Sequence, residues 1–91
     1  MPKMVKQEVK IQNRKGLHAR ASAQVVKLAE SFHSTTYICY HDMRVPAQSI
    51  MGLLMLGAAQ GSLLIVEGEG ADAEAAVSSL VELVENKFGE V

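Results

Sequence analysis

Hydrophobic and polar residues alternate near the start of the chain and then recur with a helical period. In residues 4–11, Val5, Val9 and Ile11 fall on one side and the charged residues on the other, which predicts a strand with one buried face. In residues 19–32 the apolar positions recur every three or four residues, which predicts an amphipathic helix. We expect its buried stripe to consist of Ala21, Val25, Leu28, Ala29 and Phe32.

Three further segments have the composition of strands. Thr35–Tyr40 is rich in β-branched and aromatic residues, and Met43–Val45 predicts a short strand that ends at Pro46. The turn between these two strands contains His41. Ser62–Glu67 includes a continuous apolar run, which is typical of a central strand covered on part of both faces.

Two more helices complete the pattern. Ser49 is suited to cap a helix over residues 50–56, and Gly57 is suited to end it. After a break at residues 68–71, Asp72 caps a final helix that ends at Gly89. We expect the apolar face of this helix to consist of Ala76, Val77, Leu80, Leu83, Val84 and Phe88.

The element order β-α-β-β-α-β-α predicts a single α+β domain spanning residues 1–91. Its simplest packing is a four-stranded, mostly antiparallel sheet with three helices on one face, each layer burying the apolar side of the other.

Composition narrows the function classes. Apolar residues make up 48% of the chain, charged residues 21%, and the formal net charge is −1, which is unlike a disordered chain or a basic nucleic-acid binder. Cys39 is the only cysteine, so we expect neither an internal disulfide nor a cysteine-based metal cluster. The chain shows no signal peptide and no apolar run of the roughly 20 residues that cross a bilayer. We therefore expect a cytoplasmic protein that binds neither nucleic acid nor membrane.

The best candidate for chemistry is His18, which follows Gly16 and stands at or just outside the start of the first helix. Unpaired backbone N–H groups and the positive end of the helix dipole favour an anion there and disfavour imidazolium. We expect a neutral and therefore nucleophilic ring near pH 7. Arg20, two residues further on, offers a guanidinium to phosphate oxygens. The hypothesis is a histidine that carries a phosphoryl group, and the alternative is a plain polar residue at a helix start.

A second candidate is the surface of the short helix. If Leu53 and Leu56 face the core, Met51, Leu54 and Met55 turn outward, with Ile50 at the boundary. A small domain rarely exposes so much apolar surface without a use, which favours a docking site. The alternative is a helix buried on more than one side.

With these residues in place, the sequence resembles the histidine-containing phosphocarrier protein family, HPr, of the bacterial phosphoenolpyruvate-dependent phosphotransferase system. The resemblance covers nearly the whole chain. It depends on the motifs at residues 16–20 (Gly-Leu-His-Ala-Arg) and 48–53 (Gln-Ser-Ile-Met-Gly-Leu), with support from residues 57–62 and the final helix.

The resemblance implies an open-faced β-sandwich with strand order 1-4-2-3. It implies that His18 accepts a phosphoryl group on Nδ1 from enzyme I and passes it to an enzyme IIA-type domain, with Ala19 and Arg20 binding the phosphate. Ser49 matches a position that an HPr kinase phosphorylates in some bacteria. The resemblance also implies a cofactor-free, metal-free monomer that is a carrier and not an enzyme. It assigns partner docking to Ala23, Lys27, Ile50, Met51, Leu54 and Met55.

The chain departs from the family pattern at three positions. Ala21 stands where most members have Pro, so the first helical turn lacks a fixed φ. Glu30 and Gly52 stand where sugar-transporting members tend to carry Lys. The less basic docking face favours the nitrogen-related or regulatory branch as the alternative to sugar transport. The presence of His18 excludes the catabolite-repression homologue, which lacks this histidine.

Two other classes of protein compete with this interpretation. A small hydrolase of the acylphosphatase type would need a phosphate-binding Gly-rich loop around Asn13 and Arg14, and none surrounds them. A metal- or RNA-binding module on a ferredoxin-like sandwich would need clustered ligands or paired aromatic residues, which the chain lacks.

Overall fold

A computed structural model describes residues 4–90. Four strands form one antiparallel sheet in the order β1-β4-β2-β3. The strands are β1 (Met4–Lys10), β2 (Thr35–Tyr40), β3 (Met43–Pro46) and β4 (Leu63–Glu69). This is the predicted order, with β4 in the centre between β1 and β2.

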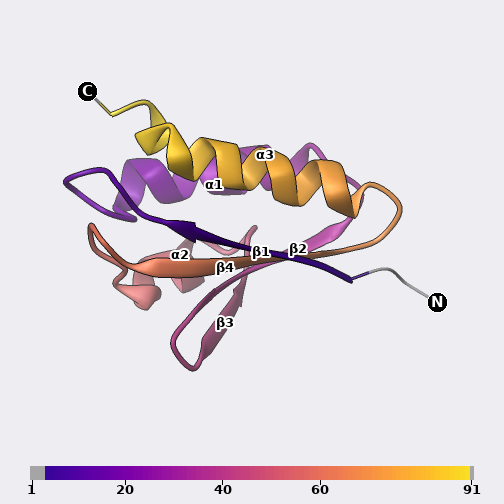
Figure 1. The fold of residues 1–91 in the computed structure, drawn as a ribbon, viewed down its shortest axis with the longest axis horizontal. Helices are drawn as coiled ribbons and strands as arrows, with labels where there is room; N and C mark the ends of the chain where they lie inside the picture. Colours follow the sequence, from indigo (N-terminus) through magenta and orange to yellow (C-terminus); the bar gives the residue numbers. More distant parts are fainter. Residues whose placement is uncertain (1–3, 91) are drawn as a thin grey trace.

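Three helices complete the fold: α1 (Ala19–Glu30), α2 (Ile50–Leu56) and α3 (Ala73–Glu85). Figure 1 shows α1 and α3 side by side over one face of the sheet, and α2 packs against α1 and β3. A short 3-10 turn, Lys87–Gly89, follows α3. The fold is therefore the predicted open sheet with three helices.

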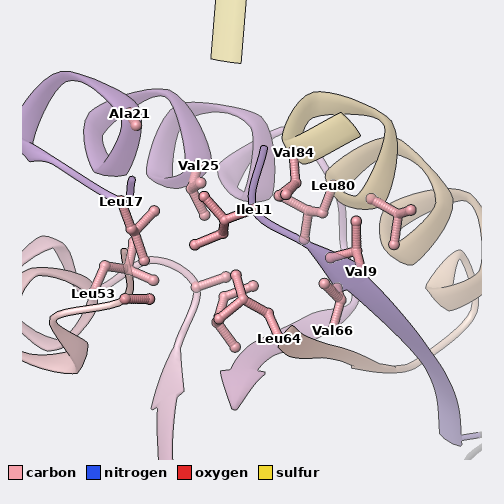
Figure 2. Packing of buried hydrophobic residues seen from close by; sticks show 14 of the residues in the cluster. Val9, Ile11, Leu17, Ala21, Val25, Leu53, Leu64, Val66, Leu80 and Val84 are labelled. Carbon is pink, nitrogen blue, oxygen red and sulfur yellow. The ribbon is translucent and has the colours of Figure 1, made fainter. Parts of the chain in front are cut away.

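One hydrophobic core lies between the sheet and the helices. Figure 2 shows Val9 of β1 and Leu64 and Val66 of β4 facing Val25 of α1 and Leu80 of α3. Leu53 and Leu56, the inward residues of α2, belong to the same core. Because each helix buries one stripe, the period of three to four residues in the sequence predicts most of these contacts.

Several predicted boundaries are wrong by a few residues. α1 ends at Glu30 and not at Phe32, because Ser31 closes it with hydrogen bonds back to the last turn. Leu28 and Phe32, expected in the core, are only half-buried. Pro46 belongs to β3. Proline has no backbone N–H to donate, and β3 is an edge strand with a neighbour on one side only, so proline is tolerated there.

The expected break at residues 68–71 is also wrong, since β4 continues through Gly68 to Glu69. A Cβ on Gly68 would lie 2.8 Å from Val77 Cγ2, so the glycine lets α3 pack closely on a central strand. α3 itself ends at Glu85. Phe88 is buried from the separate turn that follows, and Gly89 therefore does not end the helix.

Asp72 stands at the N-cap of α3 but its side chain does not cap that helix. Its carboxylate accepts hydrogen bonds from the backbone N–H groups of His33 and Ser34 at 2.9 and 2.8 Å, and from the Ser34 hydroxyl. Asp72 does not cap the helix as predicted. Its side chain instead links the start of α3 to the loop that follows α1.

The open face of the sheet carries a polar cluster with one member from each strand. Glu67 of β4 is buried, accepts a 2.9 Å hydrogen bond from Arg44 Nε of β3, and lies 3.6 Å from Lys6 Nζ of β1. The Arg44 guanidinium lies 3.6 Å from the ring centre of Tyr37 in β2. The hydrogen bond from Arg44 lowers the pKa of the Glu67 carboxyl against the opposing effect of burial. We infer that this cluster stabilises the packing of the four strands against one another.

None of the helices in residues 4–90 combines the length and the apolar character that crossing a bilayer requires. The expectation of no signal peptide depends in part on Met1, Pro2 and Lys3, which lie outside the described residues.

Candidate functional site

The loop before α1 is shaped by Gly16. Its φ is +63°, and a Cβ at this position would lie 2.5 Å from the carbonyl oxygen of Ala58. Leu17 is buried and donates its backbone N–H to that same oxygen at 2.9 Å. Only glycine fits both the left-handed conformation and the close approach, so this residue fixes how the chain enters α1.

A buried amide supports the same loop. Asn13 is 1% exposed and donates Nδ2–H to the Gly16 carbonyl oxygen at 2.8 Å. The loop backbone is thus tied to its own side chain as well as to the loop at Ala58. His18 follows a rigid support and not a flexible linker.

His18 is the N-cap residue of α1, at φ −79° and ψ −179°. Its carbonyl accepts the N–H of Ser22 at 2.8 Å, which starts the helix, whereas its side chain makes no capping hydrogen bond. The first N–H groups of a helix have no intrahelical partner, and the first turn of α1 contains no acidic residue. The start of α1 is therefore suited to an external anion.

The residues after His18 belong to the same candidate anion site. Ala19 and Arg20 are exposed, and Ala21 is buried. Because Ala21 has a backbone N–H that proline would lack, its departure from the family pattern adds a donor to the first turn. The replacement therefore leaves the anion site intact.

The imidazole of His18 is half-buried, and its Nδ1 lies 3.0 Å from the Gly16 carbonyl oxygen. A carbonyl only accepts, so this contact is a hydrogen bond when Nδ1 carries the proton. The lone pair of the neutral ring is then on Nε2. Releasing Nδ1 as a nucleophile requires that this bond break and that the proton be carried by Nε2.

A pocket of about 80 Å³ lies beside the ring. His18, Arg20 and Lys15 line it together with Gln24 of α1. The remaining wall comes from the far end of the described chain, from Phe88, Gly89 and Glu90. His18 and Arg20 were predicted, whereas Gln24 and the wall at residues 88–90 were not, because no local motif marks them.

Glu90 places a carboxylate at this pocket. Its Oε1 accepts the backbone N–H of Arg14 at 2.9 Å. Burial raises the pKa of the Glu90 carboxyl, but the nearby N–H groups of Lys15, Asn13 and Arg14 outweigh it and hold the pKa below its usual value. Glu90 is therefore ionised near pH 7.

Ser49 caps α2 as predicted, since its Oγ accepts the Gly52 N–H at 3.1 Å. Gly57 ends the helix in the left-handed conformation. A Cβ on Gly52 would lie 2.9 Å from Val45 Cβ, so α2 packs on β3 too closely for a larger side chain at position 52 without a shift.

The predicted docking residues lie on two adjacent helices. On α2, Ile50, Met51, Leu54 and Met55 are 42%, 66%, 39% and 68% exposed. On α1, Ala23 and Lys27 are exposed on the outer stripe. Since α1 packs on α2, the two sets of exposed residues lie on neighbouring helices. The other two histidines lie elsewhere: His33 follows α1 and His41 is in the turn between β2 and β3.

Within residues 4–90, no group of three or more His, Cys, Asp or Glu side chains is arranged to hold a metal ion.

Known proteins are similar to this chain over nearly its whole length. Residues 5–86 match the family model described as the PTS HPr component phosphorylation site. The chain is 44% identical over 87 residues to the phosphocarrier protein HPr of Neisseria meningitidis, covering 96% of this chain and 98% of the relative. It is 37% identical over 86 residues to the phosphocarrier protein NPr of Shewanella violacea, covering 94% of each.

A solved HPr structure from Thermoanaerobacter tengcongensis superposes on the chain with a TM-score of 0.91 at 40% identity, covering 96% of this chain and 98% of that one. Sequence and fold thus agree over nearly the whole length. The chain belongs to the HPr family, the phosphocarrier proteins of the phosphotransferase system.

Proposed function

We propose that His18 accepts a phosphoryl group on Nδ1 from phosphorylated enzyme I and passes it to an enzyme IIA-type domain. The observation that carries this proposal is the position of His18 at the uncapped start of α1, beside Arg20 and Lys15. The helix amides, including those of Ala19 and Arg20, and the two basic side chains would stabilise the phosphate charge.

The transfer needs no cofactor. The Nδ1 lone pair of neutral His18, with its proton on Nε2, attacks phosphorus as the nitrogen–phosphorus bond of the donor histidine breaks and returns its electron pair to the donor ring. The ring first leaves the Gly16 carbonyl, whose 3.0 Å contact with Nδ1 occupies that nitrogen. The second transfer to the acceptor repeats the step in reverse.

We infer a carrier and not an enzyme, because the phosphoryl group resides on the protein itself. A carrier that bound the phosphohistidine too tightly would block onward transfer. The exposed Arg20 and the open first turn of α1 are consistent with moderate stabilisation.

We propose that the exposed apolar residues of α2, with Ala23 and Lys27 of α1, dock enzyme I and enzyme IIA in turn. Met51 and Met55 are the most exposed of these residues, and methionine adapts to more than one partner surface. Docking through one surface would make the two partners compete for it. We propose that the carrier acts as a monomer in the cytoplasm.

Ser49 is the proposed site of regulation by an HPr kinase. Its hydroxyl lies at the start of α2, beside the exposed Ile50. A phosphate there would be tolerated by the helix dipole and would add negative charge to the docking surface, which would weaken docking to an acidic partner surface.

Two processes are candidates for the pathway in which the carrier acts. The similarity to HPr proteins favours sugar transport, and the similarity to an NPr protein favours the nitrogen-related branch. Glycine at position 52 and Glu30 reduce the positive charge of the docking face, which supports the second candidate.

The test of the proposed function is incubation with enzyme I and phosphoenolpyruvate, followed by intact mass measurement. We expect one added phosphoryl group that is lost in acid and kept in base. His18→Ala should remain unmodified, whereas His33→Ala and His41→Ala should behave as the wild type. An unmodified wild-type protein would overturn the proposal.

Docking has a separate test. Met51→Glu places a charge in the centre of the exposed α2 surface, and we expect it to weaken enzyme I binding about tenfold or more in calorimetry. Met43→Glu is the matched control, because Met43 is also exposed but lies on β3. Equal affinities of the two variants would remove α2 from the interface.

A further inference from the structure

The segment after α3 leaves the helix by an unusual path. Lys87, Phe88 and Gly89 all have positive φ, at +59°, +53° and +75°. Two of these three are not glycine, so the backbone is held in a conformation that residues other than glycine rarely adopt. Phe88 is 3% exposed and anchors the turn in the core.

The turn carries Glu90 across to the loop before His18. Figure 1 shows the end of the described chain, in yellow, beside the loop that leads into α1. The contact is the 2.9 Å hydrogen bond from the Arg14 N–H to Glu90 Oε1, which joins residues 76 positions apart. The turn at residues 87–89 thus brings the Glu90 carboxylate to the pocket that His18, Arg20 and Lys15 line.

Amide groups of the loop before His18 hold this carboxylate. Its Oε1 accepts the Arg14 N–H, and the N–H groups of Lys15 and Asn13 also favour the ionised form of the Glu90 carboxyl. An ionised carboxylate therefore lies at the pocket that a phosphoryl group on His18 would share.

We propose that the Glu90 carboxylate acts as an internal substitute for the phosphoryl group. In the unphosphorylated protein it supplies negative charge to the pocket of Lys15, His18 and Arg20. When His18 is phosphorylated, the two anions repel, and the segment at residues 87–90 is displaced from the Arg14 amide. Glu90 is thus a positioning residue that raises the free energy of the phosphorylated state and favours onward transfer.

This inference rests on the proposed function of His18, and it also makes a prediction that does not require phosphoryl transfer. A carboxylate in the pocket should compete with a free anion. Glu90→Gln keeps an oxygen that can accept the Arg14 N–H but removes the charge. Glu85→Gln removes the same charge from an exposed position near the end of α3 and is the matched control.

The first experiment is a titration of each unphosphorylated protein with inorganic phosphate, followed by the amide NMR signals of residues 19–21. We expect Glu90→Gln to bind phosphate about two- to fivefold more tightly than the wild type, the range for a partly exposed charge pair. Glu85→Gln should match the wild type. Equal affinities of wild type and Glu90→Gln would overturn the inference.

The second experiment is the equilibrium of phosphorylation with enzyme I at a fixed ratio of phosphoenolpyruvate to pyruvate. We expect the phosphorylated-to-free ratio to rise about two- to fivefold in Glu90→Gln and to stay unchanged in Glu85→Gln. In the wild type, the Arg14 amide signal should shift on phosphorylation as its hydrogen bond is lost. An unchanged ratio with wild-type phosphorylation intact would overturn the role of Glu90 alone, whereas no phosphorylation of the wild type would overturn the function of His18.

Discussion

The starts of α1 and α3 share a glycine that lies close to a neighbouring loop. Each helix is preceded, two residues before its N-cap, by a glycine with positive φ, at +63° for Gly16 and +137° for Gly70. Each glycine lies against a neighbouring loop: a Cβ on Gly16 would be 2.5 Å from the Ala58 oxygen, and one on Gly70 would be 2.8 Å from Ser34 Oγ. In both cases the close contact fixes the direction in which the helix starts.

The two starts differ in charge. α3 begins with Asp72 at the N-cap and Glu74 in its first turn, so its sequence supplies the negative charge that a helix start favours. α1 begins with His18 and has no acidic residue in its first turn. The two starts therefore share a positive-φ glycine but differ in charge: acidic residues stand at the start of α3, whereas the start of α1 is suited to an external anion.

The largest expected effect comes from the shared glycines. Gly16→Ala and Gly70→Ala should each lower the free energy of unfolding by about 2–4 kcal/mol, since a Cβ adds a steric overlap to an unfavourable φ. Only Gly16→Ala should also slow phosphorylation of His18. Urea denaturation and phosphorylation by enzyme I measure the two effects.

Gly57→Ala is the control for conformation alone. Gly57 has a φ of +62°, but no heavy atom lies within 4 Å of a Cβ built there. We expect a cost of about 1 kcal/mol. If it destabilises the protein as much as Gly16→Ala does, close approach is not what makes Gly16 necessary.

The next effect would convert one helix start into the other. Ala19→Glu gives α1 an acidic first turn, and we expect about a tenfold slower phosphoryl transfer with stability unchanged or raised by about 0.3–1 kcal/mol. Ala75→Glu makes the same change in the first turn of α3 and should leave transfer unaltered. Stopped-flow transfer from enzyme I distinguishes them, and equal rates for the two variants would contradict an anion site at α1.

The start of α2 is capped by an uncharged group, the Ser49 hydroxyl, and can be compared with the starts of α1 and α3. Ser49→Ala removes the acceptor of the Gly52 N–H and should cost about 1 kcal/mol of stability. The rate of His18 phosphorylation should not change. Ser78→Ala, at an exposed position of α3, is the control for a simple loss of a hydroxyl. A slower transfer in Ser49→Ala would mean that the α2 cap also organises the His18 loop.

The smallest expected effect concerns Asp72. Hydrogen bonds from the Ser34 hydroxyl and the His33 and Ser34 N–H groups hold the pKa of the Asp72 carboxyl below its usual value. The stabilising contribution is therefore complete above the unfolded pKa of about 4 and is lost as pH falls through the lower folded pKa. Asp72→Asn should lower the melting temperature at pH 7, and the difference from the wild type should narrow below about pH 4. A pH-independent difference would mean that the ionised carboxylate is not the stabilising form.

Local patterns in the sequence predicted the elements and the position of His18 at a helix start. The period of α1 located its buried stripe, and Gly16 before His18 located the helix start, because both signals depend on neighbours within a few residues. The boundaries failed where distant contacts override local preference. Gly68 stays in β4 because the sheet pairs it with Thr36 and α3 packs on it, and the Asp72 side chain turns from its own helix to Ser34.

The sequence by itself determined that this chain forms an antiparallel sheet under helices, with a histidine at a helix start that lacks acidic residues. Those properties follow from hydrophobic period, turn residues and local charge. Only the tertiary structure decided that α2 packs closely on β3 at Gly52 and that Nδ1 of His18 faces the Gly16 carbonyl. It alone brought Glu90 to the pocket, because a contact between residues 76 positions apart depends on how the whole chain packs and leaves no local signal in the sequence.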